Sequence, residues 1–207
     1  MILDQDSFLT QKLIDDVAKF VKAFYFGCKI NVPKTTTATE LLKSGKIAVR
    51  ESMFTGQPQI SAVDICKHLD QKFMSGNKKS LVASGLVDFD LYQEGLNFVF
   101  GLAIAARRCG CTSIHRSHPS FTGQQFASEV EAYNRVLFGV CKTMVHEIGH
   151  MFGMKHCTYY ECGMNGSNSA EESKDRPIQF CAVCYRKLAS CINFDPLQRY
   201  QALIDVC

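Results

Sequence analysis

The stretch HEIGHMFGMKHCTYYECGM, from His146 to Met164, decides how the rest of this sequence is interpreted. Its first five residues match the H-E-x-x-H pattern on a helix, in which two histidines four residues apart lie on one face and bind one zinc ion. Glu147 follows His146 by roughly 100 degrees around the helix, so its carboxylate can face a zinc-bound water without binding the metal. The pattern therefore predicts a catalytic helix.

A third histidine ligand follows this helix. Gly153 permits the backbone reversal that ends a helix, and His156 comes three residues later, where it can return toward the metal. Three histidines leave one tetrahedral position open for water, which is typical of a catalytic zinc. The alternative is that two histidines and a glutamate share a helix by chance, and the added glycine and histidine disfavour it.

Two pairs of cysteines come next in the chain. Cys157 and Cys162 follow His156 directly, and Cys181 and Cys184 form the pair CAVC beyond a polar loop. Four thiolates in two closely spaced pairs are typical of a closed, tetrahedral, structural zinc site. The sequence therefore predicts two zinc ions per chain, one catalytic and one structural.

From His146 to Cys184 the chain resembles the archaemetzincin (archaelysin) family of metzincin-like zinc metallopeptidases. The family signature is H-E-x-x-H-x-x-G-x-x-H-C-x4-C-x-M, followed about 17 residues later by C-x-x-C. The match departs from the signature only in the last spacer, which is one residue short between Met164 and Cys181.

The resemblance implies a role for each residue of the motif. It assigns His146, His150 and His156 to the catalytic zinc and Glu147 to the general base. It also makes Met164 the methionine of a turn beneath the metal. The thioether of that methionine is expected to form an apolar floor under the three imidazoles.

Composition favours a single compact domain. The chain has 207 residues, of which 46% are hydrophobic, enough to bury a substantial core. We expect one peptidase domain over 1–207, with an upper subdomain (1–153) that holds a sheet and the catalytic helix. A lower subdomain (154–207) is expected to hold the structural zinc. The net charge of +3 is mild and favours neither a nucleic-acid partner nor a membrane surface.

Cysteine usage and the first residues predict an intracellular, cytoplasmic protein. MILDQDSFLTQ carries acidic residues and lacks the apolar core of a signal peptide, and no apolar run approaches the length of a membrane span. We expect a monomer that acts on peptides or proteins. Seven of the eleven cysteines are not needed for zinc and are expected to be buried free thiols: Cys28, Cys66, Cys109, Cys111, Cys141, Cys191 and Cys207.

Hydrophobic periodicity predicts the remaining elements. An amphipathic helix is expected from Phe8 to Phe26 with Ser7 as its cap, and only MILDQD precedes it, so a strand there would be short. Further helices are expected at 60–73, at 125–152 and after Pro196, and strands at 28–32, 79–87 and 111–117.

The apolar run LNFVFGLAI, Leu96 to Ile104, predicts one more strand. The resemblance implies an edge strand beside the metal that pairs antiparallel with an extended substrate through its free backbone groups. We expect Phe100, Gly101, Leu102 and Ala103 to face the substrate. The alternative is a strand in the interior of the core.

The resemblance and the pattern of elements together predict an α+β fold with α/β-like character. We expect the metzincin-like zincin fold: a twisted, mixed sheet of four or five strands packed on the long active-site helix, with a zinc-stabilised C-terminal part. A horizontal cleft at the sheet edge would run over the catalytic zinc.

The predicted function is a zinc-dependent metallopeptidase. Glu147 would accept a proton from a zinc-activated water and later donate it to the leaving amine. Tyr159 or Tyr160 could supply a second donor to the oxyanion, but packing near the structural zinc is favoured for both. The alternative function is a low-turnover, zinc-stabilised protein-interaction module, but a pure scaffold has no need of Glu147. A nucleic-acid-binding zinc ribbon would need a clustered basic face, which the sequence lacks.

Overall fold

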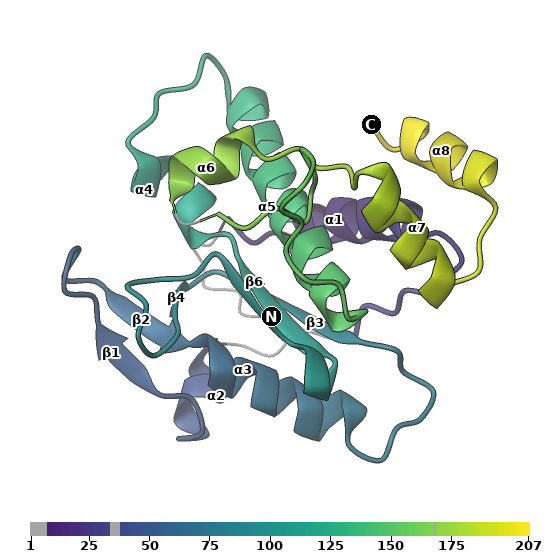
Figure 1. Ribbon diagram of the computed structural model, residues 1–207. Helices are drawn as coiled ribbons and strands as arrows, with labels where there is room; N and C mark the ends of the chain where they lie inside the picture. The colour runs from purple at the N-terminus through teal and green to yellow at the C-terminus, as the bar shows by residue number, and fades with distance from the viewer. Residues whose placement is uncertain (1–7, 34–37, 168) are drawn as a thin grey trace.

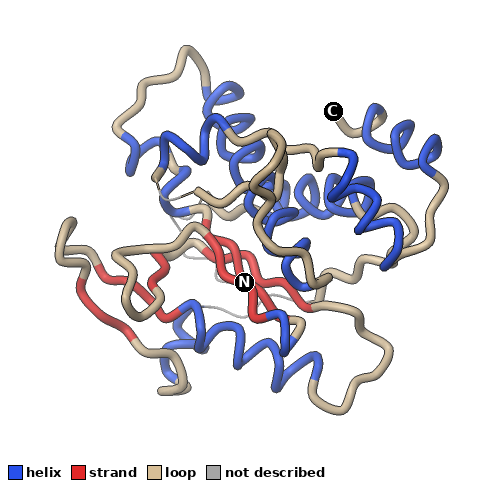
Figure 2. The backbone as a smooth tube through the Cα atoms, in the orientation of Figure 1, coloured by secondary structure: helices blue, strands red, loops and turns tan. Residues whose placement is uncertain are grey.

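The computed structural model describes residues 8–33, 38–167 and 169–207. Figures 1 and 2 show the helices and strands in one orientation. The helices are α1 (Gln11–Phe24), α2 (Ala38–Lys43), α3 (Ala62–Leu69), α4 (Pro119–Thr122), α5 (Glu129–Met151), α6 (Ala170–Asp175), α7 (Ala182–Cys191) and α8 (Pro196–Ile204). The strands are β1 (Val49–Glu51), β2 (Pro58–Ser61), β3 (Ala83–Val87), β4 (Asp90–Tyr92), β5 (Gly101–Ile104) and β6 (Cys109–Ser113).

The strands form two small mixed sheets. One has the order β1-β2-β4, with β2 antiparallel to β1 and parallel to β4. The other has the order β3-β6-β5, with β6 parallel to β3 and antiparallel to β5. The α+β class is thus confirmed, but the strands are divided between two sheets, whereas one sheet of four or five strands was expected. The division falls at Asp88 and Phe89, between β3 and β4, where the Ser113 hydroxyl donates to the Phe89 carbonyl at 2.6 Å.

The elements lie in layers around α5. Strands β5 and β6 lie between α3 on one side and α5 on the other, while α1 packs against α5 and α8 packs against α1 (Figure 1). The Tyr25 hydroxyl, just after α1, donates to the Val145 carbonyl of α5 at 2.6 Å. This arrangement holds the predicted catalytic helix between the sheet and α1.

Local sequence explains where α5 begins and ends. The Ser128 side chain accepts a hydrogen bond from the Glu131 N–H, which satisfies one free backbone donor of the first turn. At the other end Gly153 has a φ of +85°, a conformation that glycine adopts without steric cost. The expected reversal at Gly153 is therefore confirmed, and the chain turns back toward the face that carries His146.

Two apolar clusters form the core. The larger one joins α1 and α5 with buried residues of the C-terminal part, among them Cys162, Met164, Phe180 and Leu188. The smaller one lies around α3, between this helix and the strands. Residues on both sides of position 153 thus share one core, and the division into two subdomains stays a prediction.

Several expected element boundaries differ from the observed ones. Helix α1 begins at Gln11 with Thr10 as its cap, whereas Ser7 and the stretch MILDQD lie outside the described residues. The strand expected at 28–32 is wrong, since no regular structure forms there. Residues 50–59, where neither a helix nor a strand was predicted, contribute to the short hairpin of β1 and β2. That hairpin is held by pairing between strands too short to show a hydrophobic period.

The cysteines are less uniformly buried than expected. All eleven are free thiols, but Cys191 and Cys207 are exposed and Cys28 is only half-buried, so the expectation of burial is wrong for these three. Cys191 is the last residue of α7, and Cys207 follows α8. None of the described helices is both long and apolar enough to cross a membrane.

Candidate metal centre and active-site cavity

Two histidines present one ring nitrogen each to the same point. His146 and His150 lie one turn apart on α5, and their Nε2 atoms are 3.0 Å from each other. The Nδ1 atom of His146 lies 2.7 Å from the Gly163 carbonyl, and that of His150 lies 2.7 Å from the Met154 carbonyl. A neutral ring that donates from Nδ1 keeps its lone pair on Nε2, which is the tautomer that a metal needs.

The third histidine comes from the loop after Gly153. The His156 ring centroid is 5.3 Å from that of His146 and 4.9 Å from that of His150. One ring nitrogen from each histidine lies within 4.8 Å of the others, so the group could hold a metal ion. The backbone passes close by at Gly166, where an added Cβ would be 2.9 Å from the His156 Nδ1.

Burial keeps these imidazoles neutral. It lowers the pKa of His146 to about 3, with a further contribution from the Arg176 guanidinium beside it. Burial also lowers the pKa of His150 and of His156. Because a metal binds the neutral ring, the three donors fit a cation such as zinc without first having to lose protons at neutral pH.

The carboxyl group of Glu147 lies buried beside the histidines. Burial raises its pKa to about 8, although the nearby Arg176 cation acts in the opposite direction. Strand β5 lies directly against it, because an added Cβ on Gly101 would be 2.8 Å from the Glu147 Cγ. A carboxyl group with a pKa near neutral pH is suited to exchange protons with a substrate.

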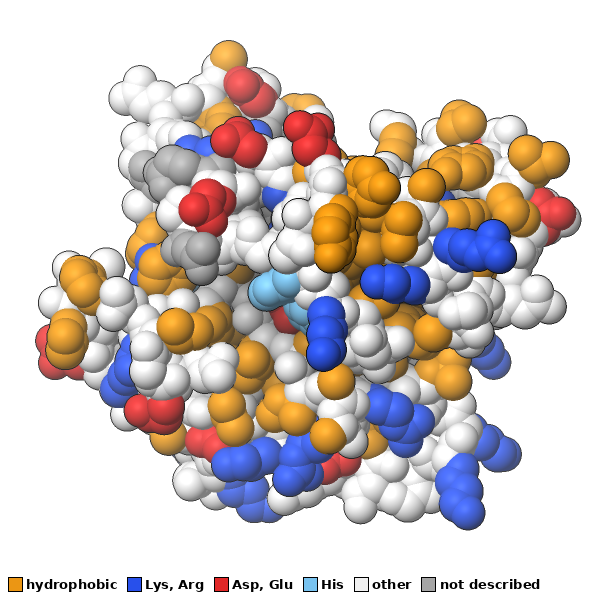
Figure 3. All heavy atoms as spheres, viewed as in Figure 1, with side chains coloured by type: hydrophobic (Ala, Val, Ile, Leu, Met, Phe, Trp, Pro, Cys, Tyr) orange, Lys and Arg blue, Asp and Glu red, His pale blue; other side chains and the backbone are white. Residues whose placement is uncertain are grey.

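A cavity of about 680 Å³ opens over this group. The residues His146, Glu147 and His150 line one side of it, and the expected substrate-facing residues 100–103 line the other. Because β5 is the last strand of its sheet, the alternative of an interior strand is excluded. On the face seen in Figure 3, histidine side chains lie at the bottom of a hollow with acidic atoms beside them.

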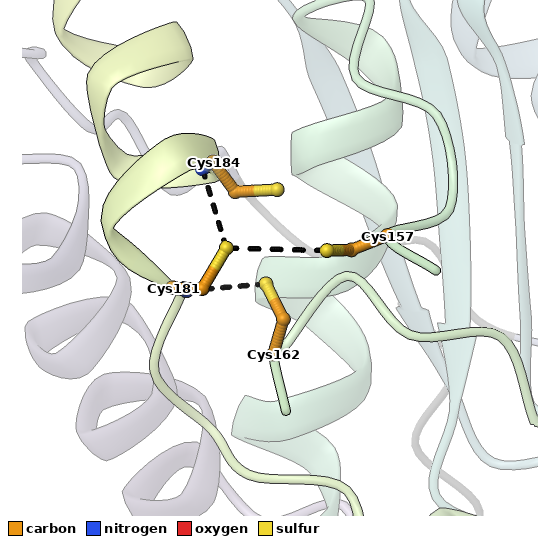
Figure 4. A group of neighbouring side chains, drawn as sticks. All are labelled: Cys157, Cys162, Cys181 and Cys184. Atoms are coloured by element: carbon orange, nitrogen blue, oxygen red, sulfur yellow. Dashed lines mark hydrogen bonds between the residues drawn. The ribbon is translucent and has the colours of Figure 1, made fainter. Parts of the chain in front are cut away.

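The four cysteines form a second cluster. Cys157 and Cys162 come from the loop after α5, Cys181 caps α7, and Cys184 lies in its first turn (Figure 4). The four sulfur atoms all lie within 4.8 Å of one another. The Sγ of Cys162 accepts hydrogen bonds from the backbone N–H groups of Cys181 at 3.2 Å and Met164 at 3.4 Å. Such N–H donors stabilise a thiolate, so this cluster fits a closed zinc site.

The methionine expected beneath the metal is fully buried. Met164 has no exposed surface and belongs to the larger core cluster. The Gly163 carbonyl that accepts from His146 belongs to the same turn of chain. The part that Met164 plays at the metal stays a prediction.

The two tyrosines considered as oxyanion donors lie outside the cavity. Tyr159 and Tyr160 are 88% and 58% exposed, and neither lines the cavity. Instead, Arg176 and Ser167 line it, and the sequence interpretation missed both. The only signal was a single arginine before Pro177 in a polar loop, which is indistinguishable in sequence from a solvated charge.

Comparisons with known proteins point to one family. The model of peptidase family M54 matches residues 1–190. The archaemetzincin of Thermococcus kodakarensis is 31% identical over 87% of this chain and 90% of its own length. Archaemetzincin-2 of Pongo abelii is 30% identical over 95% of this chain. This chain spans only 58% of the length of that mammalian relative.

Solved structures share the fold. The archaemetzincin from Methanopyrus kandleri superposes with a TM-score of 0.62 at 25% identity, over 91% of this chain and 90% of that one. The archaemetzincin from Archaeoglobus fulgidus, at 23% identity, has a TM-score of 0.59 over 86% of this chain and 94% of that one.

Proposed function

Since the chain belongs to peptidase family M54, we propose that it is a zinc-dependent metallopeptidase that hydrolyses peptide bonds. The observation that carries the proposal is the buried carboxyl group of Glu147 beside three convergent imidazoles in one cavity. His146, His150 and His156 would hold the catalytic zinc. Bound zinc supplies Lewis acidity, which polarises the scissile carbonyl and acidifies the attacking water.

Glu147 would carry the proton through the reaction. As a carboxylate it accepts a proton from the attacking water, and it then donates this proton to the leaving amine. Its burial makes the proton exchange effective near neutral pH, because burial raises its pKa to about 8 in the chain without metal. A bound cation would favour the carboxylate form by simple electrostatic attraction.

Strand β5 would bind the substrate backbone. It is the edge strand of its sheet, and Gly101 allows it to lie against Glu147. An extended peptide would pair antiparallel with residues 100–103 through backbone hydrogen bonds, which do not depend on the side chains of the peptide. Peptides or proteins are thus the proposed substrate class.

A second zinc ion would bind Cys157, Cys162, Cys181 and Cys184. The proposal of two zinc ions per chain rests on the two separate donor groups. The predicted cytoplasmic location suits the free thiols, since a reducing compartment preserves metal-binding cysteines. The monomeric state and the absence of a nucleic-acid partner stay predictions.

The interaction-module alternative is disfavoured by the environment of Glu147. A metal site with a purely structural role does not require a buried carboxyl group beside its ligands, and burying a carboxyl group costs desolvation energy. The four-cysteine site alone would suffice for a zinc-stabilised scaffold.

Hydrolysis of a fluorogenic peptide library by the zinc-loaded protein and by Glu147→Gln tests the proposed function. We expect the variant to keep both zinc ions and to lose roughly 100- to 10,000-fold in turnover. Metal analysis of both proteins is the control, because it separates loss of the base from loss of the metal. Equal turnover in the two zinc-loaded proteins would end the proposal that Glu147 is the base.

A further inference from the structure

Arg176 places a buried positive charge in the wall of the active-site cavity. Its side chain lines the same cavity as His146 and Glu147, and the residue is only 8% exposed. One guanidinium nitrogen, Nη1, donates to the Asn165 carbonyl at 3.2 Å. No acidic side chain of the described residues lies within ion-pair distance of the guanidinium.

Two buried polar atoms of this wall lack hydrogen-bond partners within the described part of the chain. They are Nε of Arg176 and the hydroxyl oxygen of Ser167, and both residues line the cavity. A buried cation without an ion-pair partner and a buried donor without an acceptor each cost free energy. A negatively charged ligand group in the cavity would satisfy both.

The contact between Arg176 and His146 does not supply the guanidinium with a hydrogen-bond acceptor. Nη1 lies 3.0 Å from the His146 Nδ1, but this Nδ1 also lies 2.7 Å from the Gly163 carbonyl. When Nε2 keeps its lone pair for a metal, Nδ1 carries the hydrogen and donates it to Gly163. The ring then has no acceptor for Arg176, so the guanidinium remains available to a ligand.

The position of Arg176 along the cavity indicates which part of a substrate it would meet. Gly101, at the start of β5, lies against Glu147 of α5. Ala103, later in β5, pairs with Gly110 of β6, and Gly110 lies against Met151, one turn later in α5. Strand β5 and helix α5 therefore run in the same direction. A peptide antiparallel to β5 would therefore run toward the earlier turns of α5.

Arg176 lies at this earlier end of the cavity. The buried Lys142, one turn before His146, donates from Nζ to the carbonyls of Lys174 at 3.0 Å and Arg176 at 2.8 Å. The segment that carries Arg176 is thus held beside that turn of α5. The substrate residues that come after the scissile bond would lie there.

We infer that Arg176, with Ser167, binds a carboxylate on the first substrate residue after the scissile bond, an inference that rests on the proposed peptidase function. That carboxylate is either the side chain of Asp or Glu, or the free α-carboxylate of a C-terminal residue. A guanidinium binds either form through paired N–H donors. The substrate class is therefore peptides cut before an acidic or a C-terminal residue.

Two pairs of peptide libraries separate the two sources. In the first pair the residue after the cut is Glu or Gln within a peptide whose C-terminus is amidated. In the second pair this residue is a C-terminal Gln, as the free acid or as the amide. Mass spectrometry of the products identifies cuts before the fixed residue. We expect wild-type protein to prefer the carboxylate member of one pair by roughly ten- to a hundredfold in kcat/KM.

Substitution of the guanidinium tests its part in this preference. Arg176→Gln should abolish the preference, Arg176→Lys should retain part of it, and the matched control Arg135→Gln, at an exposed position of α5, should leave it unchanged. Equal cleavage of both members in both pairs by wild-type protein overturns the inference. It is also overturned if Arg176→Gln lowers all four rates by the same factor.

Binding provides a readout that does not require turnover. In the Glu147→Gln background, fluorescence anisotropy should show tighter binding of the carboxylate peptide of the preferred pair, and Arg176→Gln should remove that difference. If Glu147→Gln cuts peptides as fast as wild type, the proposed function fails, while the ratio of binding constants still decides the inference on Arg176.

Discussion

Gly149 and Met164 are in direct contact: an added Cβ on Gly149 would lie 2.5 Å from the Met164 sulfur. The absence of a side chain at Gly149 therefore lets the buried thioether pack against the helix that carries His146 and His150. The neighbouring Gly163 carbonyl accepts the hydrogen bond that orients the His146 ring. One turn of chain thus both packs under the helix and positions a metal ligand.

We expect Gly149→Ala to destabilise the protein by about 1–3 kcal/mol, the usual effect of overpacking a buried contact. Met164 is fully buried in the larger core cluster, so its thioether would have to repack among other core side chains. Thermal unfolding of the zinc-loaded protein measures the effect. Zinc titration should also show weaker binding at the histidine site, because Gly163 moves with Met164.

Gly139→Ala is the matched control in the same helix. An added Cβ there would meet only the Ser117 side chain, with the Cβ at 3.8 Å and the hydroxyl oxygen at 3.3 Å, and this hydroxyl can rotate. Alanine stabilises a helix interior relative to glycine by roughly 0.5–1 kcal/mol, so this variant should be as stable as wild type or slightly more stable. Equal destabilisation by the two substitutions would contradict the assigned contact.

Burial of Glu147 predicts a pH-dependent stability in protein depleted of the histidine-bound metal. The pKa of this group is about 8 in the folded chain and 4.5 when it is unperturbed. Between these values the folded state holds a proton that the unfolded state has lost, so the free energy of unfolding falls as pH rises from 4.5 to about 8. Below and above that window the contribution is constant.

Glu147→Gln should remove this dependence. We expect chemical unfolding between about pH 4.5 and 9 to show that, as pH rises, the free energy of unfolding of the variant increases relative to that of wild type by on the order of a few kcal/mol. His146, whose pKa is lowered to about 3, stabilises the folded state as pH rises toward 6.5. That effect is common to both proteins and cancels in the difference. A difference that is constant with pH would show that Glu147 is not desolvated.

Cys181→Ser and His156→Ala should each reduce the zinc content from two ions to one, with different effects on folding. Cys181 caps α7, and its cluster partners Cys162 and Cys184 are buried in the larger core cluster. Loss of that zinc should therefore lower the free energy of unfolding by several kcal/mol, since binding to a structural site is coupled to folding. Metal analysis and circular dichroism of each variant measure the two effects.

His156 lies in the loop after α5 and is the most exposed of the three histidines, so its replacement should remove the catalytic zinc with little change in secondary structure. Cys207→Ser, at an exposed thiol outside both clusters, is the control and should keep two zinc ions. Equal unfolding of the two ligand variants would contradict the separate roles of the two sites.

Gly101→Ala should impair catalysis more than stability. An added Cβ would lie 2.8 Å from the Glu147 Cγ and 2.9 Å from the Cys111 carbonyl oxygen, which belongs to the adjoining strand. Because the backbone of β6 cannot move away, β5 or Glu147 must shift. A shift of this size lowers kcat by roughly 100-fold. Peptide hydrolysis at saturating substrate measures it, and a variant with normal kcat would refute the close approach.

Short-range patterns account for what could be predicted from the sequence. His146 and His150 are four residues apart on a helix, which places them on one face in almost any fold. Gly153 and His156 extend the same local geometry, and the paired spacings of the four cysteines also define a ligand group. The apolar run from Leu96 to Ile104 indicated a strand, and its last four residues form β5 at the sheet edge.

Long-range pairing explains what could not be predicted. The hairpin of β1 and β2 is too short to show a period, and the apolar run at 28–32 forms no strand because no strand pairs with it. Arg176 is 30 residues from His146 in the chain, yet the two side chains are in contact. Nothing in the polar loop around Arg176 distinguishes it from a surface charge.

The sequence by itself thus determined the donor atoms of the two metal sites, because helical periodicity and short loop spacings act over a few residues. Only the tertiary structure decided which ionisable side chains are buried. Desolvation depends on every segment that packs over a group, so the raised pKa of Glu147 and the unneutralised Arg176 became visible only when β5, α5 and the loop before α7 enclosed one cavity.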